Sequence, residues 1–295
     1  MDTTLARSAL AAVSEVTGGC FCCRFEDLMN VANQLIDGGT TDTIIAEAVG
    51  SCTDLQETVI RPLRKYHGDQ FTVAPLTTVV DPQRLRGFAR ATERGEPESD
   101  LSYLFSKQLT EADIIAVNKI DKIDADAAAS ATANLWRRYP TARIVPYSAR
   151  TGVGLPQLLT GWRDEATWSA DLDIDYDRYA AAEARLAWLN QRFTLQATND
   201  GFNPTTWARA VLSHLLDVAA AHEAEIGHAK LTVDTDDGTT KMSITGNGGV
   251  SDQAITEAIA RADTLVGARS STSIGPVSFK PGYPRPAHRL SAHQT

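Results

Sequence analysis

The stretch Asp113-Ile-Ile-Ala-Val-Asn-Lys-Ile-Asp121 decides how this chain folds. Its apolar run is short and rich in β-branched residues, which is typical of a parallel strand buried on both faces. The polar residues that follow it would stand at the edge of the sheet where ligands bind in parallel folds. We therefore predict a buried strand over Asp113–Val117 and a ligand-binding loop over Asn118–Asp121.

Segments with helical and strand patterns alternate on both sides of this stretch, which predicts an α/β fold with a parallel sheet. The expected strands are Val13–Thr17 (the end of one), Asp42–Val49, Phe71–Val80 with a break at Pro75, and Arg143–Tyr147. The expected helices are Phe25–Asp37, Leu55–Tyr66 with a kink or restart at Pro62, Leu101–Leu109, Ala125–Tyr139 and Gly154–Trp162. The polar stretch Asp81–Asp100 contains proline and glycine and predicts a surface insertion.

The composition changes after Trp168, which predicts a second domain. We expect an α/β domain over residues 1–168, an acidic linker over 169–180, a smaller α+β domain over 181–280 and a disordered tail over 281–295. In the second domain the expected strands are Glu183–Leu195, His228–Asp234, Thr240–Thr245 and Val277–Phe279, and the expected helices are Asn203–His222 and Ser251–Thr264. This β-α-β-β-α-β order is that of ferredoxin-like folds.

The loop Asn118–Asp121 carries the chemistry that reads a guanine base. The Asp121 carboxylate can accept from two ring-edge donors that adenine lacks, Asn118 can bond the purine edge, and the Lys119 stem can cover the base face. After the next strand, Ser148 and Ala149 would place a hydroxyl and a backbone amide beside the same base. Such a site rejects a wrong base because its polar groups would be left unpaired. The competing interpretation is a polar turn after a core strand.

Three of the four cysteines, Cys20, Cys22 and Cys23, lie within four residues and follow Gly18-Gly19. Neighbouring Cα atoms are about 3.8 Å apart, closer than a disulfide prefers, so we predict no structural bridge within this cluster. Packed thiolates bind Zn²⁺ or another soft transition metal well, and we predict these three cysteines as metal ligands. Buried inert cysteines and a thiol redox loop are the competing interpretations.

Glu47 and Gly50 lie at the end of the expected strand Asp42–Val49. An acid in this position can hold a Mg²⁺-bound water or orient an attacking water, and a glycine N–H can approach a phosphate closely. An ordinary loop-facing acid is the competing interpretation. The fourth cysteine, Cys52, comes just after this pair and is a candidate further metal ligand, as is His67; a small buried residue that fills space is the alternative for Cys52.

Bulk composition excludes several classes of function. The chain has 295 residues, 43% of them apolar, and a net charge of −9. No large basic patch is visible, which argues against nucleic acid as a partner. No apolar run reaches the length of about 18 residues that spans a membrane, and no signal peptide pattern opens the sequence. Because the cysteines do not form a disulfide framework, we expect a reducing, cytoplasmic environment.

Taken in order, Gly-Gly-Cys-Phe-Cys-Cys (18–23), Glu47-Ala-Val-Gly50, Asn118-Lys-Ile-Asp121 and Ser148-Ala149 resemble the motifs of the CobW, UreG and HypB family of P-loop GTPases, and in particular its CobW-like branch. The resemblance covers roughly residues 10–165. It implies a GTP-dependent metallochaperone or metal-insertase that uses GTP or GDP with Mg²⁺, carries zinc or another transition metal, and delivers it to a client protein. The residue roles that it implies are guanine reading by Asn118, Lys119 and Asp121, a Mg²⁺ and γ-phosphate switch at Glu47 and Gly50, and metal binding by Cys20, Cys22 and Cys23.

This sequence departs from the family at one feature. The family begins with a strand and the loop Gly-x-x-x-x-Gly-Lys-Ser/Thr, which cradles the phosphates. Here no glycine precedes Gly18, and the dipeptide Gly-Lys does not occur. We therefore expect an incomplete P-loop-NTPase-like sheet that lacks its first strand and phosphate loop.

Three explanations of this difference stay open. The start was assigned at an internal methionine, another chain supplies that half, or nucleotide chemistry has been lost. A homodimer is a separate expectation for the partners of this chain. The sequence does not decide whether this chain hydrolyses GTP by itself. The alternative function is a non-catalytic metal carrier or adaptor in which the GTPase fold is a relic.

Overall fold

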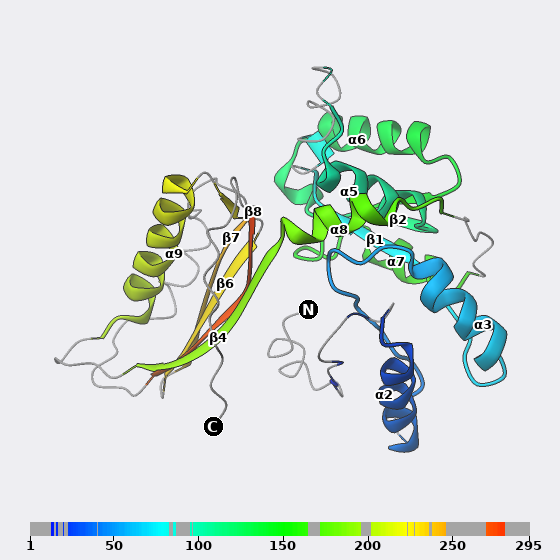
Figure 1. Ribbon diagram of the computed structural model, residues 1–295, viewed down its shortest axis with the longest axis horizontal. Helices are drawn as coiled ribbons and strands as arrows, with labels where there is room; N and C mark the ends of the chain where they lie inside the picture. The colour runs from blue at the N-terminus through cyan, green and yellow to red at the C-terminus, as the bar shows by residue number, and fades with distance from the viewer. Residues whose placement is uncertain are drawn as a thin grey trace. The chain divides into compact units, whose positions relative to one another are not determined.

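A computed structural model shows two compact units, Met1–Ala182 and Glu183–Thr295 (Figure 1). It describes residues 13–14, 16, 20, 23–39, 41–82, 85–86, 95, 97–164, 172–195, 202–222, 224–226, 228–235, 238–245 and 270–280. Among these residues, no helix combines the length and the apolar character needed to cross a membrane.

The described part of the first unit is built around a parallel sheet of three strands in the order β1-β2-β3. The strands are β1 (Thr77–Val80), β2 (Ile114–Val117) and β3 (Arg143–Pro146). Val80 pairs with Val117, and Val117 pairs with Pro146, so the three strands end level with one another. The loops that follow them therefore begin at one edge of the sheet. This confirms the predicted α/β fold with a parallel, P-loop-like sheet.

Helices cover both faces of this sheet. The helical elements of the unit are α2 (Phe25–Asp37), the π-helical turn η1 (Gln56–Ile60), α3 (Arg61–His67), α5 (Asp100–Thr110), the 3₁₀ turn η2 (Ile120–Lys122), α6 (Ala125–Arg138), α7 (Leu155–Gly161) and α8 (Tyr176–Ala184). On one face, Ile115 and Val117 of β2 pack into a core that includes Leu109 of α5 and Leu135 of α6. On the other, Ile114 and Ala116 of β2 pack with Leu158 of α7.

Double burial of β2 explains its sequence. All four residues of the strand are buried, so no position favours a polar side chain. Local signals set where the flanking helices begin. The Ser99 hydroxyl caps α5 by accepting from the Ser102 backbone N–H (3.1 Å), and Asp124 caps α6 by accepting from the Ala127 backbone N–H (2.7 Å). The predictions for β2, β3 and these helices are confirmed to within one or two residues.

The predicted strand Asp42–Val49 is wrong. These residues form an irregular segment that pairs with none of the three described strands, and Ile45 is 68% exposed. An apolar run favours burial, but a β-strand also needs a neighbouring strand that pairs with its backbone N–H and carbonyl groups. Within the described part of the first unit, no such neighbour lies beside this segment.

Other predicted boundaries also move. The expected strand Phe71–Val80 shrinks to β1, because residues 71–76 are irregular. The described residues of Val13–Thr17 form no strand. The helix α8 begins at Tyr176, inside the stretch expected to be an acidic linker, and it also takes the first two residues of the expected strand Glu183–Leu195. The helix predicted over Ser251–Thr264 and the tail 281–295 lie outside the described residues.

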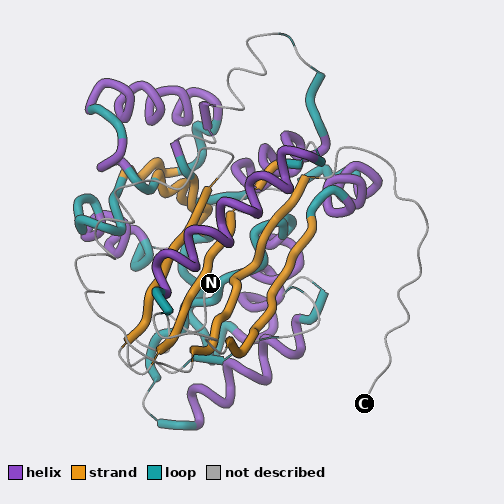
Figure 2. Tube along the Cα trace, turned by 90° about the vertical axis from the view of Figure 1, so that its left-hand side faces the viewer, coloured by secondary structure: helices purple, strands orange, loops and turns teal. Residues whose placement is uncertain are grey.

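The second unit is an antiparallel sheet with a helix packed on it (Figure 2). Its elements are β4 (Ala187–Leu195), α9 (Pro204–Ala221), β5 (Glu225–Ile226), β6 (His228–Thr235), β7 (Gly238–Thr245) and β8 (Ser270–Lys280). The strand order is β4-β8-β6-β7, with β5 paired to β8. Because β8 lies between β4 and β6, the connection through α9 is a split β-α-β unit.

The capping residue and the apolar residues of α9 have the roles that the sequence predicts for them. Asn203 caps α9 by accepting from the Thr206 backbone N–H (2.9 Å), with Pro204 in the first turn. Leu212 of α9 is fully buried against β6 and β7, where Leu231 and Ile244 are also buried. The predicted helix and the β6–β7 hairpin are confirmed.

Candidate functional site

The residues after β1, β2 and β3 meet at one edge of the parallel sheet. The Asn118 N–H donates to the Val80 carbonyl (2.9 Å), and the Ile120 N–H donates to the Tyr147 carbonyl (3.4 Å). These backbone bonds continue the sheet pairing beyond the last strand residues. They bring the loop Asn118–Asp121 beside the ends of both neighbouring strands.

Asn118 ties two loops together. Its Oδ1 accepts from the N–H of Lys119 (2.8 Å) and from the N–H of Ala149 (3.0 Å). The first bond tightens the turn directly after β2, and the second joins that turn to the loop after β3. The two predicted base-reading loops are therefore in direct contact.

Lys119 is held in an uncommon backbone conformation. Its φ of 63° lies in the left-handed region, which non-glycine residues seldom adopt outside turns and functional sites. Its ammonium forms an ion pair with the Asp81 carboxylate at 2.6 Å. Asp81 follows β1 directly, so this ion pair joins the first and second of the three loops.

Asp121 is joined to Ser148. The Ser148 hydroxyl donates to Oδ1 of Asp121 at 2.6 Å, and its oxygen accepts from the Thr151 N–H at 3.1 Å. Ser148 is fully buried, whereas Asp121 is exposed. The hydrogen bond from Ser148 lowers the pKa of Asp121 below its ordinary value. The carboxylate is thereby kept ionised, which is the form that accepts hydrogen bonds from a ligand.

Gly154 fixes the shape of the loop that carries Ser148. It has a φ of 74°, and a Cβ added to it would stand 2.3 Å from the Pro146 carbonyl oxygen and 2.9 Å from the Tyr147 Cα. Any side chain would therefore push the loop away from the end of β3. The loop closes through the Ser148 N–H, which donates to the Val153 carbonyl at 2.8 Å.

Glu47 and Gly50 do not stand at a strand end. Glu47 is exposed in the irregular segment, and Gly50 begins a turn. The side-chain amide of Gln108, at the end of α5, donates to the Gly50 carbonyl (3.0 Å) and to the Cys52 carbonyl (2.8 Å). Gln108 thus fixes the backbone after the predicted switch, a role that the sequence analysis missed.

Two buried carboxyl groups lie at the opposite end of β2. Glu111 accepts from the Thr53 hydroxyl (3.1 Å) and the Gln56 N–H (3.2 Å), and Asp113 accepts from the Leu76 N–H (2.7 Å). Burial raises the pKa of Glu111 to about 7 and raises the pKa of Asp113 as well. These groups fasten the segment after Cys52 to the sheet, at the edge away from the base-reading loops.

The structure describes three of the four cysteines, Cys20, Cys23 and Cys52. The Sγ atoms of Cys20 and Cys23 are 3.8 Å apart, because Cys23 and Arg24 donate their N–H groups to the Cys20 carbonyl and curl the chain. Cys20 is disulfide-bonded, whereas Cys23 and Cys52 are in no disulfide; Cys22 lies outside the described residues. The expectation of no bridge in this cluster is therefore wrong, because the spacing argument applied to the adjacent pair and not to Cys20.

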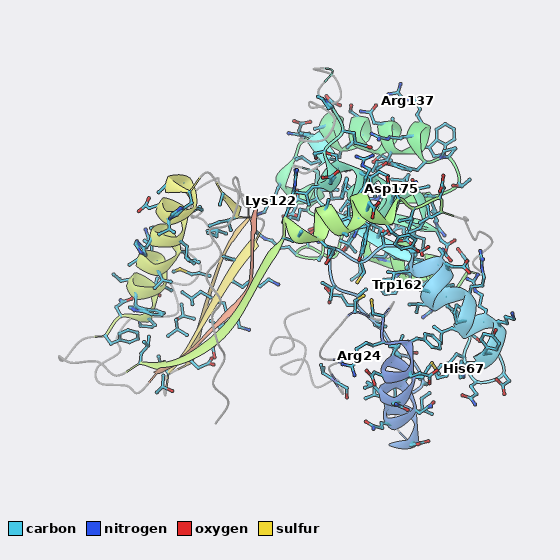
Figure 3. The ribbon with its side chains drawn as sticks, in the orientation of Figure 1. Arg24, His67, Lys122, Arg137, Trp162 and Asp175 are labelled. Atoms are coloured by element: carbon cyan, nitrogen blue, oxygen red, sulfur yellow. The ribbon has the colours of Figure 1, made fainter. Side chains whose placement is uncertain are left out.

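Among the described residues, no group of three or more histidine, cysteine, aspartate or glutamate side chains is arranged to hold a metal ion. Cys20, Cys23 and Cys52 therefore do not form one metal site. His67, which Figure 3 labels, is the last residue of α3. Its ring lies 6.0 Å from the ring of Phe25, the first residue of α2, which follows the cysteine turn. Because Cys22 is not described, the predicted three-cysteine site stays a prediction.

Part of this chain is similar to known proteins. Residues 1–146 match the family described as CobW/HypB/UreG, nucleotide-binding domain. Residues 1–146 belong to the CobW/HypB/UreG family. The chain is also 29% identical over 172 residues to a protein named Zinc chaperone CobW from Pseudomonas aeruginosa. That match covers 51% of this chain and 44% of the relative, so it spans less than half of the relative's length.

Membership of the CobW/HypB/UreG family confirms the resemblance drawn from the motifs. The structure brings Asn118, Lys119, Asp121, Ser148 and Ala149 together at one edge. Glu47 and Gly50 lie in the irregular segment that precedes β1 and do not follow any of the three strands. Their proposed roles stay predictions. The residues missed by sequence reasoning are Asp81, Gln108 and Glu111; only Asp81, which follows an expected strand, gave a usable signal.

Proposed function

We propose that the first unit binds guanine nucleotides through the loops after β1, β2 and β3. The observation that carries this proposal is the pair of hydrogen bonds from Ser148 to Asp121 (2.6 Å) and from Ala149 to Asn118 (3.0 Å). They assemble, from two separate loops, the side chains whose chemistry suits guanine. The family to which residues 1–146 belong supports the same function.

Each residue has a stated part in binding. The ionised Asp121 accepts from the N1–H and N2–H₂ groups of guanine, two donors that adenine does not present together. Ser148 holds that carboxylate in place, because Ser148 is buried and its hydroxyl donates a hydrogen bond to Oδ1 of Asp121. The Lys119 stem covers one face of the base, with its ammonium anchored by Asp81.

We further propose that the cysteine turn carries zinc, as the name of the P. aeruginosa relative indicates for that protein. Two sulfur ligands of a tetrahedral Zn²⁺ ion, each bound at about 2.3 Å, stand about 3.8 Å apart. The Sγ atoms of Cys20 and Cys23 are separated by 3.8 Å, which fits this spacing. Zinc binding then requires reduction of Cys20, because only a thiolate is a ligand. Cys22 supplies the third sulfur in this proposal.

The coupling of the two sites is the remaining part of the proposal. Glu47 and Gly50 would respond to the Mg²⁺ and γ-phosphate of bound GTP, and a metal-receiving client protein in the cytoplasm would take the zinc. We propose no hydrolytic step for this chain, because it contains no Gly-x-x-x-x-Gly-Lys-Ser/Thr sequence to hold the phosphates. Another chain is the proposed source of that loop, since a second copy of this chain has the same sequence. A metal carrier without catalysis remains the alternative function.

Titration of the full chain with GDP and with ADP, followed by NMR, tests the nucleotide proposal. We expect GDP to bind at least about tenfold more tightly than ADP, because the adenine edge leaves Asp121 without its donors. Equal affinities would contradict it. Zinc titration of the reduced chain against the Cys22→Ser variant tests the metal proposal, for which we expect loss of tight binding in the variant. A chain that discriminates the bases but keeps tight zinc binding in Cys22→Ser would contradict Cys22 as a zinc ligand and leave the nucleotide proposal standing.

A further inference from the structure

Helix α5 supports two segments of the first unit that are far apart in the sequence. The first is residues 50–56, here named the turn segment, which follows Glu47. Gln108, near the end of α5, donates to the carbonyls of Gly50 and Cys52 at 3.0 and 2.8 Å. Glu111, directly after the helix, accepts from the Gln56 N–H at 3.2 Å. The C-terminal end of α5 therefore holds the turn segment in place.

The second segment is residues 173–178, here named the strap, which leads into α8. The Asp175 N–H donates to the Tyr103 hydroxyl at 2.7 Å, and the Lys107 ammonium donates to the Asp173 carbonyl. Figure 3 labels Asp175 at the start of α8. Tyr103 and Lys107 are one turn apart on α5, so the strap runs along this helix.

Arg178 fastens the strap to the beginning of α5. Its guanidinium donates to a carboxylate oxygen and to the backbone carbonyl of Glu98, each at 3.1 Å, and reaches Asp100 at 3.5 Å. It also lies over the ring of Tyr103, 4.1 Å from the ring centre. A planar guanidinium that both stacks and forms a hydrogen-bonded fork holds one orientation better than an isolated ion pair does.

The strap and the turn segment are also joined directly. The Tyr176 hydroxyl donates to Oδ2 of Asp54 at 2.8 Å, and Asp54 adopts the left-handed conformation with a φ of 64°. Burial raises the pKa of Asp54, and the bond to Asp54 raises the pKa of Tyr176, as expected of a hydroxyl that donates to a carboxylate. One hydrogen bond thus connects residues that are 122 positions apart in the chain.

The strap also lies where the first unit ends. Helix α8 runs from Tyr176 to Ala184, the first unit ends at Ala182, and the second unit begins at Glu183. Ala182 is fully buried. The strap therefore includes the first residues of a helix whose last residues belong to the second unit.

We propose that the strap, docked on α5 and bonded to Asp54, couples the position of the turn segment to that of helix α8. The proposal deepens the proposed function, because the turn segment follows the residues assigned to sense the nucleotide. The two states are a docked and a released strap, and displacement of the turn segment favours release. Such a coupling is reciprocal: loosening either segment must loosen the other by the same factor.

Labelling of Cys52 measures this coupling without any nucleotide or metal. Cys52 lies in the turn segment and is only 4% exposed, so its thiol reacts when that segment opens. In the full chain with Cys20→Ser, Cys22→Ser and Cys23→Ser, it is the single thiol. We expect Tyr176→Phe to raise the labelling rate by a maleimide about fivefold, the usual effect of one lost hydrogen bond. Tyr66→Phe, the same change at a residue of α3 that is 65% exposed, should leave the rate unchanged.

The reciprocal measurement is amide hydrogen exchange over 176–182. We expect Gln108→Ala, which frees the turn segment, to speed exchange in α8 by a similar factor, whereas Gln157→Ala on the exposed side of α7 should not. An unchanged Cys52 rate in Tyr176→Phe, or faster exchange confined to residues 50–56 in Gln108→Ala, would overturn the proposal. Because neither measurement uses a ligand, a chain that ignores guanine nucleotides would contradict the proposed function and leave this coupling standing.

Discussion

Replacing Glu111 with glutamine should stabilise the fold at alkaline pH and have less effect in acid. Glu111 is 1% exposed, and burial raises its pKa from 4.5 to about 7. The folded chain therefore binds this proton more tightly than the unfolded chain does. The stability linked to this proton is fully present below pH 4.5, and it is lost as the pH rises towards 7. A shift of this size amounts to about 3 kcal/mol above neutrality.

The Glu111→Gln variant imitates the protonated form. Its amide can donate to the Thr53 hydroxyl and accept from the Gln56 N–H, the two groups that contact the carboxyl now. We expect the free energy of unfolding of the variant to exceed that of the parent by an amount that grows by about 2 kcal/mol between pH 5.5 and pH 8. Urea denaturation at the two pH values measures this difference.

The matched control is Glu26→Gln, the same change at an exposed glutamate of α2, for which the difference from the parent should be equal at both pH values. A difference between Glu111→Gln and the parent that stays constant from pH 5.5 to pH 8 would refute the assignment of a buried, proton-binding carboxyl to Glu111. A difference that shrinks with rising pH would refute its sign.

Further changes test other parts of the structure. Ser148→Ala should raise the pKa of Asp121 towards its ordinary value, because the hydrogen bond that lowers it is gone; NMR titration of the Asp121 carboxyl would show no change if that bond is absent in solution. Gly154→Ala should destabilise the first unit by about 2 kcal/mol or more in urea denaturation, since its Cβ would meet the Pro146 carbonyl; an unaffected melt would contradict the loop geometry. Asn203→Ala should cost about 1 kcal/mol through loss of the α9 cap, measured by thermal unfolding, and no cost would mean that the cap is not formed.

Local patterns were enough to predict the centre of the first unit. Ile114–Val117 is apolar at every position because both of its faces are covered, and such a run predicts a buried parallel strand without knowledge of its neighbours. The order of Asn118, Lys119 and Asp121 after it predicted the base-reading loop. Their contacts to Ser148 and Ala149 follow from the rule that parallel strands end at one edge.

Long-range contacts explain what the sequence did not predict. The apolar run near Ile45 predicted a strand, but composition does not show whether a partner strand lies alongside. In the sequence, Glu111 lies between a predicted helix and a predicted strand, where an exposed acid is also common. Its contact with the Gln56 N–H joins residues that are 55 positions apart, and no local pattern predicts such a contact. The same holds for Gln108, whose two acceptors lie 58 and 56 residues before it. Asp81 could have been found, because it follows β1 as Asn118 follows β2.

The base preference of the Asp121→Asn variant tests the central claim most directly. Asparagine offers one donor and one acceptor in place of two acceptors, so it matches the edge of xanthine and not that of guanine. We predict that the full chain prefers GDP over xanthosine diphosphate, and that Asp121→Asn reverses this order, as measured by NMR titration with both nucleotides. A variant that retains the parent's affinity for GDP would contradict the assignment of Asp121, and with it the guanine site at this edge of the sheet.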